Sequence, residues 1–128
     1  MPIIYALACT ECDNSKMVGF INVPFDVREN GERKNLPHPG EDRAARHLTG
    51  LSVRNLRKRN RIGQRDMFVC ERCLKTQLFA SDEILEACPQ CAHTELLAIR
   101  TLLGKTESHM RCAKCRNGSL VLKRDGIA

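Results

Sequence analysis

Eight cysteines, arranged as four Cys-x-x-Cys pairs, constrain this chain more than any other feature of its sequence. Two thiolates three residues apart can bind one metal ion from a tight turn, and two such pairs complete a tetrahedral all-sulfur site. The sequence therefore predicts a protein with two structural Zn²⁺ ions. The predicted ligands are Cys9, Cys12, Cys70, Cys73, Cys88, Cys91, Cys112 and Cys115, and no cysteine lies outside the pairs.

Metal is expected to decide whether a chain of this composition folds. It has 128 residues, five aromatic side chains and no tryptophan, and its apolar residues fall in short runs. A four-cysteine zinc site contributes on the order of 10 kcal/mol of apparent binding free energy. The whole stability of a typical domain is only about 5–15 kcal/mol.

Disulfides are the main alternative use for eight cysteines. Adjacent cysteines in Cys-x-x-Cys bond to each other mainly at redox sites, so this spacing suits metal better than a disulfide framework. Met1-Pro2 runs straight into Ile3-Ile4-Tyr5 without a basic leader, and no apolar run approaches the roughly 20 residues of a membrane helix. We therefore expect a reducing compartment, cytoplasmic or nuclear, and no membrane.

Positive charge is concentrated in one segment. The formal net charge is +6, and eight thiolates with two Zn²⁺ would leave about +2, so overall basicity is a weak argument for a nucleic-acid partner. The segment 43–65 is more informative, because it holds eight Arg or Lys residues and no acid. These residues are Arg43, Arg46, Arg54, Arg57, Lys58, Arg59, Arg61 and Arg65.

Apolar patterning predicts strands near the N-terminus. Residues 3–8 are expected to form a buried strand that leads into the first cysteine pair. Apolar and polar residues alternate over 21–27, which predicts a half-buried strand, and Pro24 on its polar side indicates a sheet edge. Asn30-Gly31 predicts a hairpin turn, although residues 32–36 are too polar to indicate a clear second strand.

Residues 37–40 (Pro-His-Pro-Gly) are typical of a linker, and a helical stretch is expected to follow. Acids at positions 41–42 and arginines further along match the helix dipole. Gly50 with Ser52 predicts a division into two short helices, with Ser52 capping the second.

The segment from about 67 to 100 resembles a zinc ribbon. Strands are expected at 67–69 and 76–80, with a returning strand at 83–87, and fourteen residues separate Cys73 from Cys88. The resemblance implies a hairpin that carries metal turns, and it indicates a fold rather than a function. This chain has Leu74 and Ala92 where zinc ribbons often have glycine after the second cysteine.

Residues 94–103 fit either a third strand or a short helix. Asn117-Gly118 after the last pair can adopt the left-handed backbone that metal turns often require, and residues 120–122 are expected to form a closing strand.

Four cysteine pairs can share two metals in three ways. A nested scheme joins the inner pairs as a ribbon and the outer pairs as a second site, which also lets strands at 3–8 and 119–123 pair. It resembles the cysteine-rich domain of J-protein chaperones in connectivity only. A sequential scheme joins the first with the second pair and the third with the fourth. A crossed scheme resembles a RING domain, but the long gap between Cys12 and Cys70 argues against it.

The nested scheme predicts a small, zinc-dominated α+β fold with short antiparallel hairpins and an inserted basic helical segment. Its predicted parts are an outer zinc module of residues 1–27 with 104–128, a linker and basic helical insertion over 28–66, and an inner zinc ribbon over 67–103.

The cysteines argue against catalysis, because eight thiolates fill both sites and leave no open position for water or substrate. His93 and His109 lie near metal turns but are expected on the surface or around the site. His38 and His47 have no partner at ligand spacing. Iron is an alternative metal, since the pairs also resemble rubredoxin, an electron carrier whose sites are usually wrapped in aromatic side chains.

We therefore predict a non-enzymatic, zinc-binding accessory of transcription, translation or replication that binds DNA or RNA through the Arg-rich segment. Arginine forks match phosphate oxygens, and neutralised phosphates release counterions. Cations near the metal turns (Arg72, Arg111, Lys114 and Arg116) could extend the surface. The alternative is a protein-protein docking module with structural zinc only, whose contact edges would be residues 78–85 and 21–27.

Overall fold

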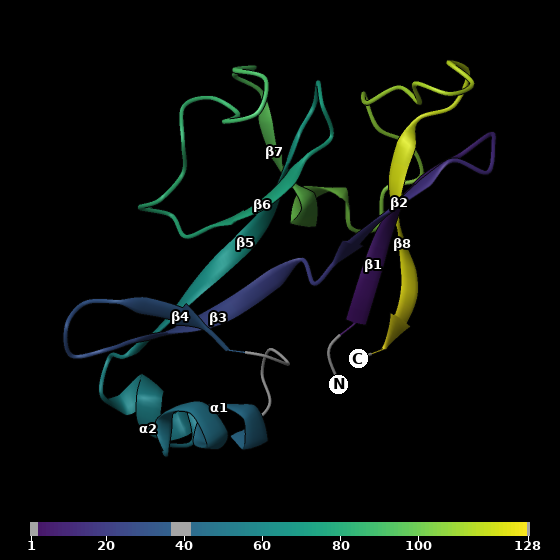
Figure 1. The fold of residues 1–128 in the computed structure, drawn as a ribbon. Helices are drawn as coiled ribbons and strands as arrows, with labels where there is room; N and C mark the ends of the chain where they lie inside the picture. Colours follow the sequence, from purple (N-terminus) through teal and green to yellow (C-terminus); the bar gives the residue numbers. More distant parts are fainter. Residues whose placement is uncertain (1–2, 37–41, 128) are drawn as a thin grey trace.

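The computed structural model describes residues 3–36 and 42–127, and it shows a small α+β protein with two antiparallel sheets (Figure 1). The first sheet has the strand order β2-β1-β8. These strands are β1 (Ile3–Cys9), β2 (Ser15–Gly19) and β8 (Leu120–Ile127). Pairing of β1 with β8 joins the two ends of the described chain, as the predicted pairing of 3–8 with 119–123 requires.

The second sheet is built around β5 (Ile62–Cys70), which pairs with three other strands. Its order is β4-β3-β5-β6, and β7 also pairs with β5. The remaining strands are β3 (Asn22–Val27), β4 (Arg33–Asn35), β6 (Thr76–Phe79) and β7 (Leu96–Ala98). β3 belongs to the segment 1–27, which the sequence analysis assigned to the outer zinc module. It pairs with β5, the strand that leads into the predicted inner zinc ribbon.

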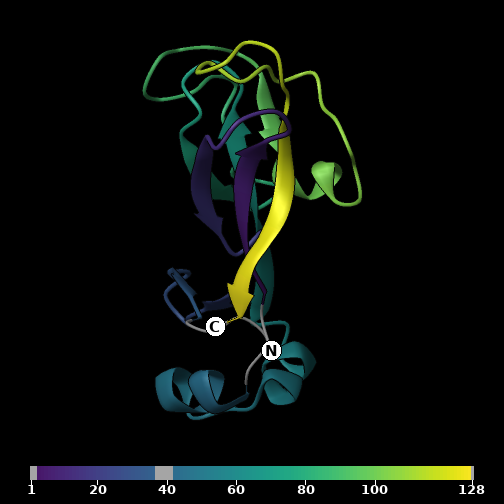
Figure 2. The ribbon, with the colours of Figure 1, turned by 90° about the vertical axis from the view of Figure 1, so that its right-hand side faces the viewer.

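Two short helices, α1 (Asp42–Thr49) and α2 (Val53–Lys58), lie within the segment expected to be helical. Gly50 at φ +77° separates them, and the Ser52 hydroxyl accepts a hydrogen bond from the Asn55 backbone N–H, as predicted. The predicted linker at 37–40 lies outside the described residues. Figures 1 and 2 place the helices at the opposite end of the molecule from the loops that carry the metal turns.

The main core lies between the two sheets, where the first sheet faces the viewer in Figure 2. It combines residues of β1, β2 and β8 with Val69 of β5 and with η1 (Ile99–Leu102), a 3-10 helix. Two cysteines of the outer pairs, Cys9 and Cys112, belong to this core. A separate small core of Leu36, Ala45, Val53 and Leu56 holds the helices against the end of the second sheet.

The strand predicted at 21–27 is confirmed as β3, but the predictions that it is half-buried and lies at a sheet edge were wrong. β3 lies between β4 and β5, and its residues 23–26 are all buried. Pro24 has no backbone N–H to donate, and it is tolerated because β4 pairs only with residues 25–27 of β3. Just past the end of β4, the Leu36 N–H donates to the Pro24 carbonyl.

The Asn30-Gly31 turn is confirmed, with Gly31 at φ +85°. Its polar return arm does form a strand, β4.

The returning strand expected at 83–87 is absent from the described structure, where these residues form turn and irregular backbone. Glu83 accepts hydrogen bonds from Arg65 and from the Ala80 backbone N–H, which fixes a turn. β5 is paired instead by β7. The ambiguous segment 94–103 contains both elements that its pattern allowed, because β7 continues directly into η1.

Candidate metal centres and basic surface

The structure gathers the eight cysteines into two groups of four, in the nested arrangement. Within each group the sulfur atoms lie within 4.8 Å of one another, and all eight cysteines are free of disulfides. The outer cluster consists of Cys9, Cys12, Cys112 and Cys115, and the inner cluster of Cys70, Cys73, Cys88 and Cys91.

Strand pairing explains both groups. Cys9 at the end of β1 lies opposite Leu120 at the start of β8, so the turn of the first pair meets that of the last. Cys70 at the end of β5 lies opposite Leu96 at the start of β7, which follows the third pair.

The spacing of the sulfur atoms fits a tetrahedral metal site. In the outer cluster Cys9 Sγ lies 3.5 Å from Cys115 Sγ, and Cys12 Sγ lies 3.7 Å from Cys112 Sγ. The corresponding distances in the inner cluster are 3.5 and 3.6 Å. A zinc–sulfur bond of about 2.3 Å requires tetrahedral sulfurs about 3.8 Å apart. Both clusters can therefore hold one metal ion each, and zinc fits them.

Three metal turns share one backbone design. The residue after the second cysteine has positive φ in each: 62° at Leu74, 62° at Ala92 and 61° at Arg116. Its N–H donates to the carbonyl of the first cysteine at 2.8, 2.8 and 2.9 Å respectively. The left-handed conformation closes this hydrogen bond. At the last pair, the left-handed position is therefore Arg116 rather than Asn117 or Gly118.

Gly118 has a different role from the one expected. A Cβ atom at this position would lie 2.5 Å from Cys9 Sγ and 2.9 Å from the Glu11 backbone nitrogen. The glycine therefore allows the last metal turn to approach the first closely enough to share one metal.

Nearby N–H groups stabilise some of the thiolates. The pKa of Cys112 is lowered to about 6, mainly by a hydrogen bond from the Cys115 backbone N–H. Burial opposes this shift, and a hydrogen bond from the Asn14 side chain adds to it. Burial raises the pKa of the Cys70 thiol, but the N–H groups of Cys73 and Arg72 outweigh it and lower this pKa to about 6. Such groups favour thiolate, which is the form that binds metal.

Other thiols in the same clusters have raised pKa values. The Asn14 N–H lowers the pKa of Cys12, but burial and the three neighbouring cysteines raise it to about 12. At Cys91, the His93 N–H likewise lowers the pKa, while burial and the other thiols raise it to about 11. Four thiolates this close repel one another, and a divalent cation at their centre offsets that repulsion. The donor set thus matches a divalent metal.

Replacing Ala92 with glycine is expected to stabilise the metal-loaded protein by about 0.5–1 kcal/mol. Ala92 is exposed and has φ +62°, a backbone conformation that costs a residue with a Cβ about 1–2 kcal/mol. Part of that gain is lost because glycine has more freedom in the unfolded chain. Thermal unfolding with saturating zinc measures the difference. Ala113→Gly is the matched control, since Ala113 is exposed but not at positive φ, and this substitution should destabilise.

Six of the eight cations in the Arg-rich segment are exposed on or next to the helices. Among residues 3–36 and 42–127 none of these six forms an ion pair. They are Arg43, Arg46, Arg54, Arg57, Lys58 and Arg59.

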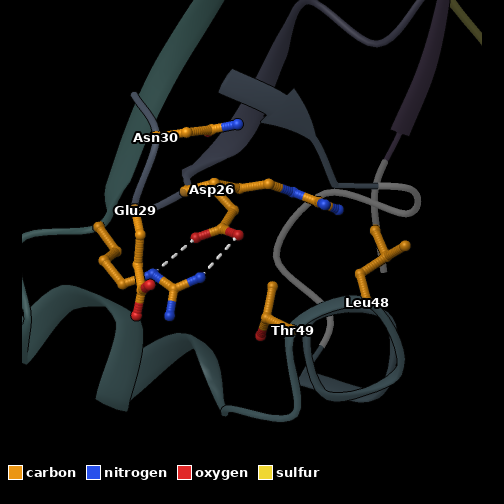
Figure 3. Close-up of a pocket in the computed structure, with 7 residues that line it drawn as sticks. Asp26, Glu29, Asn30, Leu48 and Thr49 are labelled. Atoms are coloured by element: carbon orange, nitrogen blue, oxygen red, sulfur yellow. Dashed lines mark hydrogen bonds and ion pairs between the residues drawn. The ribbon is translucent and has the colours of Figure 1, made fainter. Parts of the chain in front are cut away.

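Arg61 turns inward instead and forms a double ion pair with Asp26 (Figure 3). Arg61 Nε donates to Asp26 Oδ1 at 3.1 Å and Arg61 Nη2 donates to Oδ2 at 2.9 Å. Asp26 is only 2% exposed. The pair lies at a pocket of about 450 Å³ between the β3–β4 turn and α1, which is also lined by Glu29 and Leu48. A structural role therefore accounts for Arg61.

Arg65 is also held internally. Its guanidinium donates to both carboxylate oxygens of Glu83 at 2.8 Å and stacks 4.8 Å from the centre of the Phe25 ring. Arg33 stacks on the same ring at 4.9 Å and pairs with Asp82 and Glu83. The pKa of Glu83 is lowered to about 2 by hydrogen bonds from the Arg65 guanidinium and the Ala80 N–H, which outweigh the opposite effect of burial. These contacts fasten the 80–83 turn to the second sheet.

Sequence reasoning missed Asp26 and Glu83 as partners of predicted nucleic-acid ligands. Asp26 occupies a polar position in the alternating pattern of 21–27, so nothing in the sequence indicated its burial. No signal marked Glu83 either, whose partner lies 18 positions earlier in the chain, on β5.

The cations near the metal turns do not extend the helical surface. Both views place the metal turns and the helices at opposite ends of the molecule (Figures 1 and 2). Lys114 pairs there with Asp13 at 2.6 Å. His109 contacts Glu71 through its Nε2, and neither His93 nor His109 belongs to a described cysteine cluster.

The fold and the two clusters define a small α+β protein with two four-cysteine sites that can hold metal ions. Compared with protein-family models, with curated proteins and with solved structures, the chain matches none. No helix within the described residues is long and apolar enough to cross a membrane.

Proposed function

We propose that this is a non-enzymatic protein with structural zinc in both clusters that binds nucleic acid through α1, α2 and the residues just after them. The observation that carries this proposal is the set of six exposed, unpaired cations at one end of the described structure. A reducing compartment, cytoplasmic or nuclear, follows from the need to keep eight thiols free.

The electrostatics of this surface support a polyanionic partner. Between Arg43 and Arg65 the sequence has no acidic residue, and the one acid in α1, Asp42, points its carboxylate at the Val53 N–H of α2. Arginine binds phosphate oxygens through a planar fork of donors. Each neutralised phosphate releases counterions, so binding should weaken steeply as salt increases.

The metal sites support a structural rather than a catalytic role. Four sulfurs already fill a tetrahedral shell in each cluster, so a bound zinc would have no position left for water or substrate. The clusters instead hold β1, β5, β7 and β8 together, and the sheets in turn support the helices at the far end.

Binding of a mixed pool of fluorescent DNA and RNA fragments, measured across a salt series, tests the proposal. Six phosphate contacts predict a slope of log K against log salt of about −4 to −5. Changing Arg57, Lys58 and Arg59 together to alanine, called here the helix variant, should reduce affinity at low salt by at least about tenfold and flatten the slope by about 3.

The matched control changes Arg72, Lys75 and Arg111 to alanine and is called here the metal-end variant. It removes the same number of arginines and lysines from exposed positions at the opposite end. Its affinity should stay close to that of the wild type. Equal losses in the two variants, or no binding by the wild type at 50 mM salt, would reject the proposal.

A protein-docking function is the second candidate, and exposed apolar residues favour it. Ile84 and Leu85 are 48% and 45% exposed in irregular backbone directly after the turn that Glu83 fixes. β3 cannot serve as the other contact edge, because β4 and β5 cover both its sides. A pull-down that survives nuclease treatment and is lost on Ile84→Ser with Leu85→Ser would support this function.

A further inference from the structure

The aromatic side chains indicate which form of nucleic acid the basic surface suits. Proteins that bind single strands usually stack bases on exposed aromatic rings. In this protein all five aromatic residues are buried or only partly exposed, and none lies in α1 or α2. They are Tyr5, Phe20, Phe25, Phe68 and Phe79. The surface thus offers phosphate contacts without a platform for unpaired bases.

The basic surface is helical and projects from the end of the molecule. α1 and α2 are joined by the three-residue turn 50–52, and their apolar residues share one small core with Leu36. Two paired helices with a short turn containing glycine are a common arrangement for placing one helix in a DNA groove. The pair lies at the end of the molecule opposite the metal turns (Figure 1), and its buried apolar residues pack in that small core while its cations are exposed.

The outward face of α2 carries the donors that such contact needs. Val53 and Leu56 are buried, while Arg54, Asn55 and Arg57 are exposed. Lys58 in the last turn and Arg59 at the C-cap are also exposed. Arginine reaches phosphates and guanine edges, and asparagine can pair with adenine edges.

Shape then favours B-form DNA. An α-helix with its side chains is about 10–12 Å wide, and the major groove of B-DNA is about 12 Å wide. The major groove of an RNA duplex is deep and too narrow for side chains to read. We propose, on the basis of the proposed function, that the ligand is double-stranded DNA, with α2 directed at the major groove and α1 along the backbone.

The position of α2 is fixed well enough for this role. The Asp42 carboxylate accepts the Val53 N–H at 3.0 Å, which ties the two helices together. At its other end the chain turns through Asn60 at φ +54° into Arg61, which Asp26 holds. The presented cations are thus carried by a braced element rather than a free tail.

Fluorescence anisotropy with four probes of one 24-nucleotide sequence tests the inference: duplex DNA, single-stranded DNA, duplex RNA and single-stranded RNA. The zinc-loaded full chain is titrated at 50, 100 and 200 mM salt. Duplex DNA is expected to bind at least about tenfold more tightly than each other probe. The helix variant should lose this preference together with its affinity, whereas the metal-end variant should keep both.

The outcomes separate this inference from the proposed function. Equal binding of single strands and duplexes would leave nucleic-acid binding standing and overturn the duplex assignment. Equal binding of RNA and DNA duplexes would overturn the contact with the major groove. No binding of any probe at 50 mM salt would overturn the proposed function itself.

Discussion

Cys112→Ser is expected to unfold most of the protein, whereas Cys73→Ser should leave the first sheet folded. Cys112 is 0% exposed and packs in the main core with Leu7 and Val69, so loss of a metal held by Cys112 would disturb that core directly. Cys73, which belongs to the inner cluster, is exposed. A structural zinc contributes on the order of 10 kcal/mol, which is comparable to the whole stability of a typical domain, about 5–15 kcal/mol.

Native mass spectrometry and circular dichroism together measure this difference. The wild type should carry two zinc ions, Cys73→Ser should carry one and retain part of its sheet signal, and Cys112→Ser should lose both its fold and its metal. A zinc chelator should unfold the wild type cooperatively. Conversely, if Cys112→Ser kept two metals, or if the metal-free wild type kept its thermal transition, the outer cluster would not be a structural metal site.

The cysteine spacing was enough to predict the clusters, because the chemistry of a four-sulfur site leaves few ways to combine four pairs. The sequence left three groupings of the pairs open and favoured the nested one, since it lets the strands at 3–8 and 119–123 pair; the structure shows that grouping. Local turn signals were equally reliable at Gly31 and Ser52, where the required backbone or cap depends on one residue. These features are specified by short stretches of sequence.

Features that depend on distant partners could not be predicted. Asp26 reads as a solvent-facing residue in an alternating strand, and only the packing of Arg61 beside it makes its burial acceptable. The segment 83–87 has apolar residues that fit a strand, but Arg65 holds Glu83 in a turn and β7 takes the position beside β5. In both cases an ion pair between separate segments overrides the local pattern.

The same ion pairs divide the Arg-rich segment into two groups. A charge count over 43–65 treats all eight cations alike, yet ion pairs with Asp26 and Glu83 commit Arg61 and Arg65 to the fold. Only the remaining six face outward. Stability and binding should therefore respond to different arginines that lie close together in the sequence.

Arg61→Ala is expected to destabilise the protein by about 3–5 kcal/mol. It leaves the Asp26 carboxylate buried without its partner, and an uncompensated buried charge costs about that much. Changing both residues, Asp26→Asn with Arg61→Met, should cost less than Arg61→Ala alone, because no unpaired charge remains. Denaturant unfolding of the zinc-loaded variants measures each free energy.

Arg59→Ala is the matched control, because Arg59 lies two positions away and is exposed without an ion-pair partner in the described structure. It should change the free energy of unfolding by no more than about 0.5 kcal/mol. Nucleic-acid affinity should show the reverse pattern. Arg59→Ala should lose affinity several-fold, whereas Arg61→Ala should change it little when measured under conditions in which that variant is still folded. If instead Arg61→Ala weakened binding without loss of stability, Arg61 would face the ligand, and its pairing with Asp26 would not describe the protein in solution.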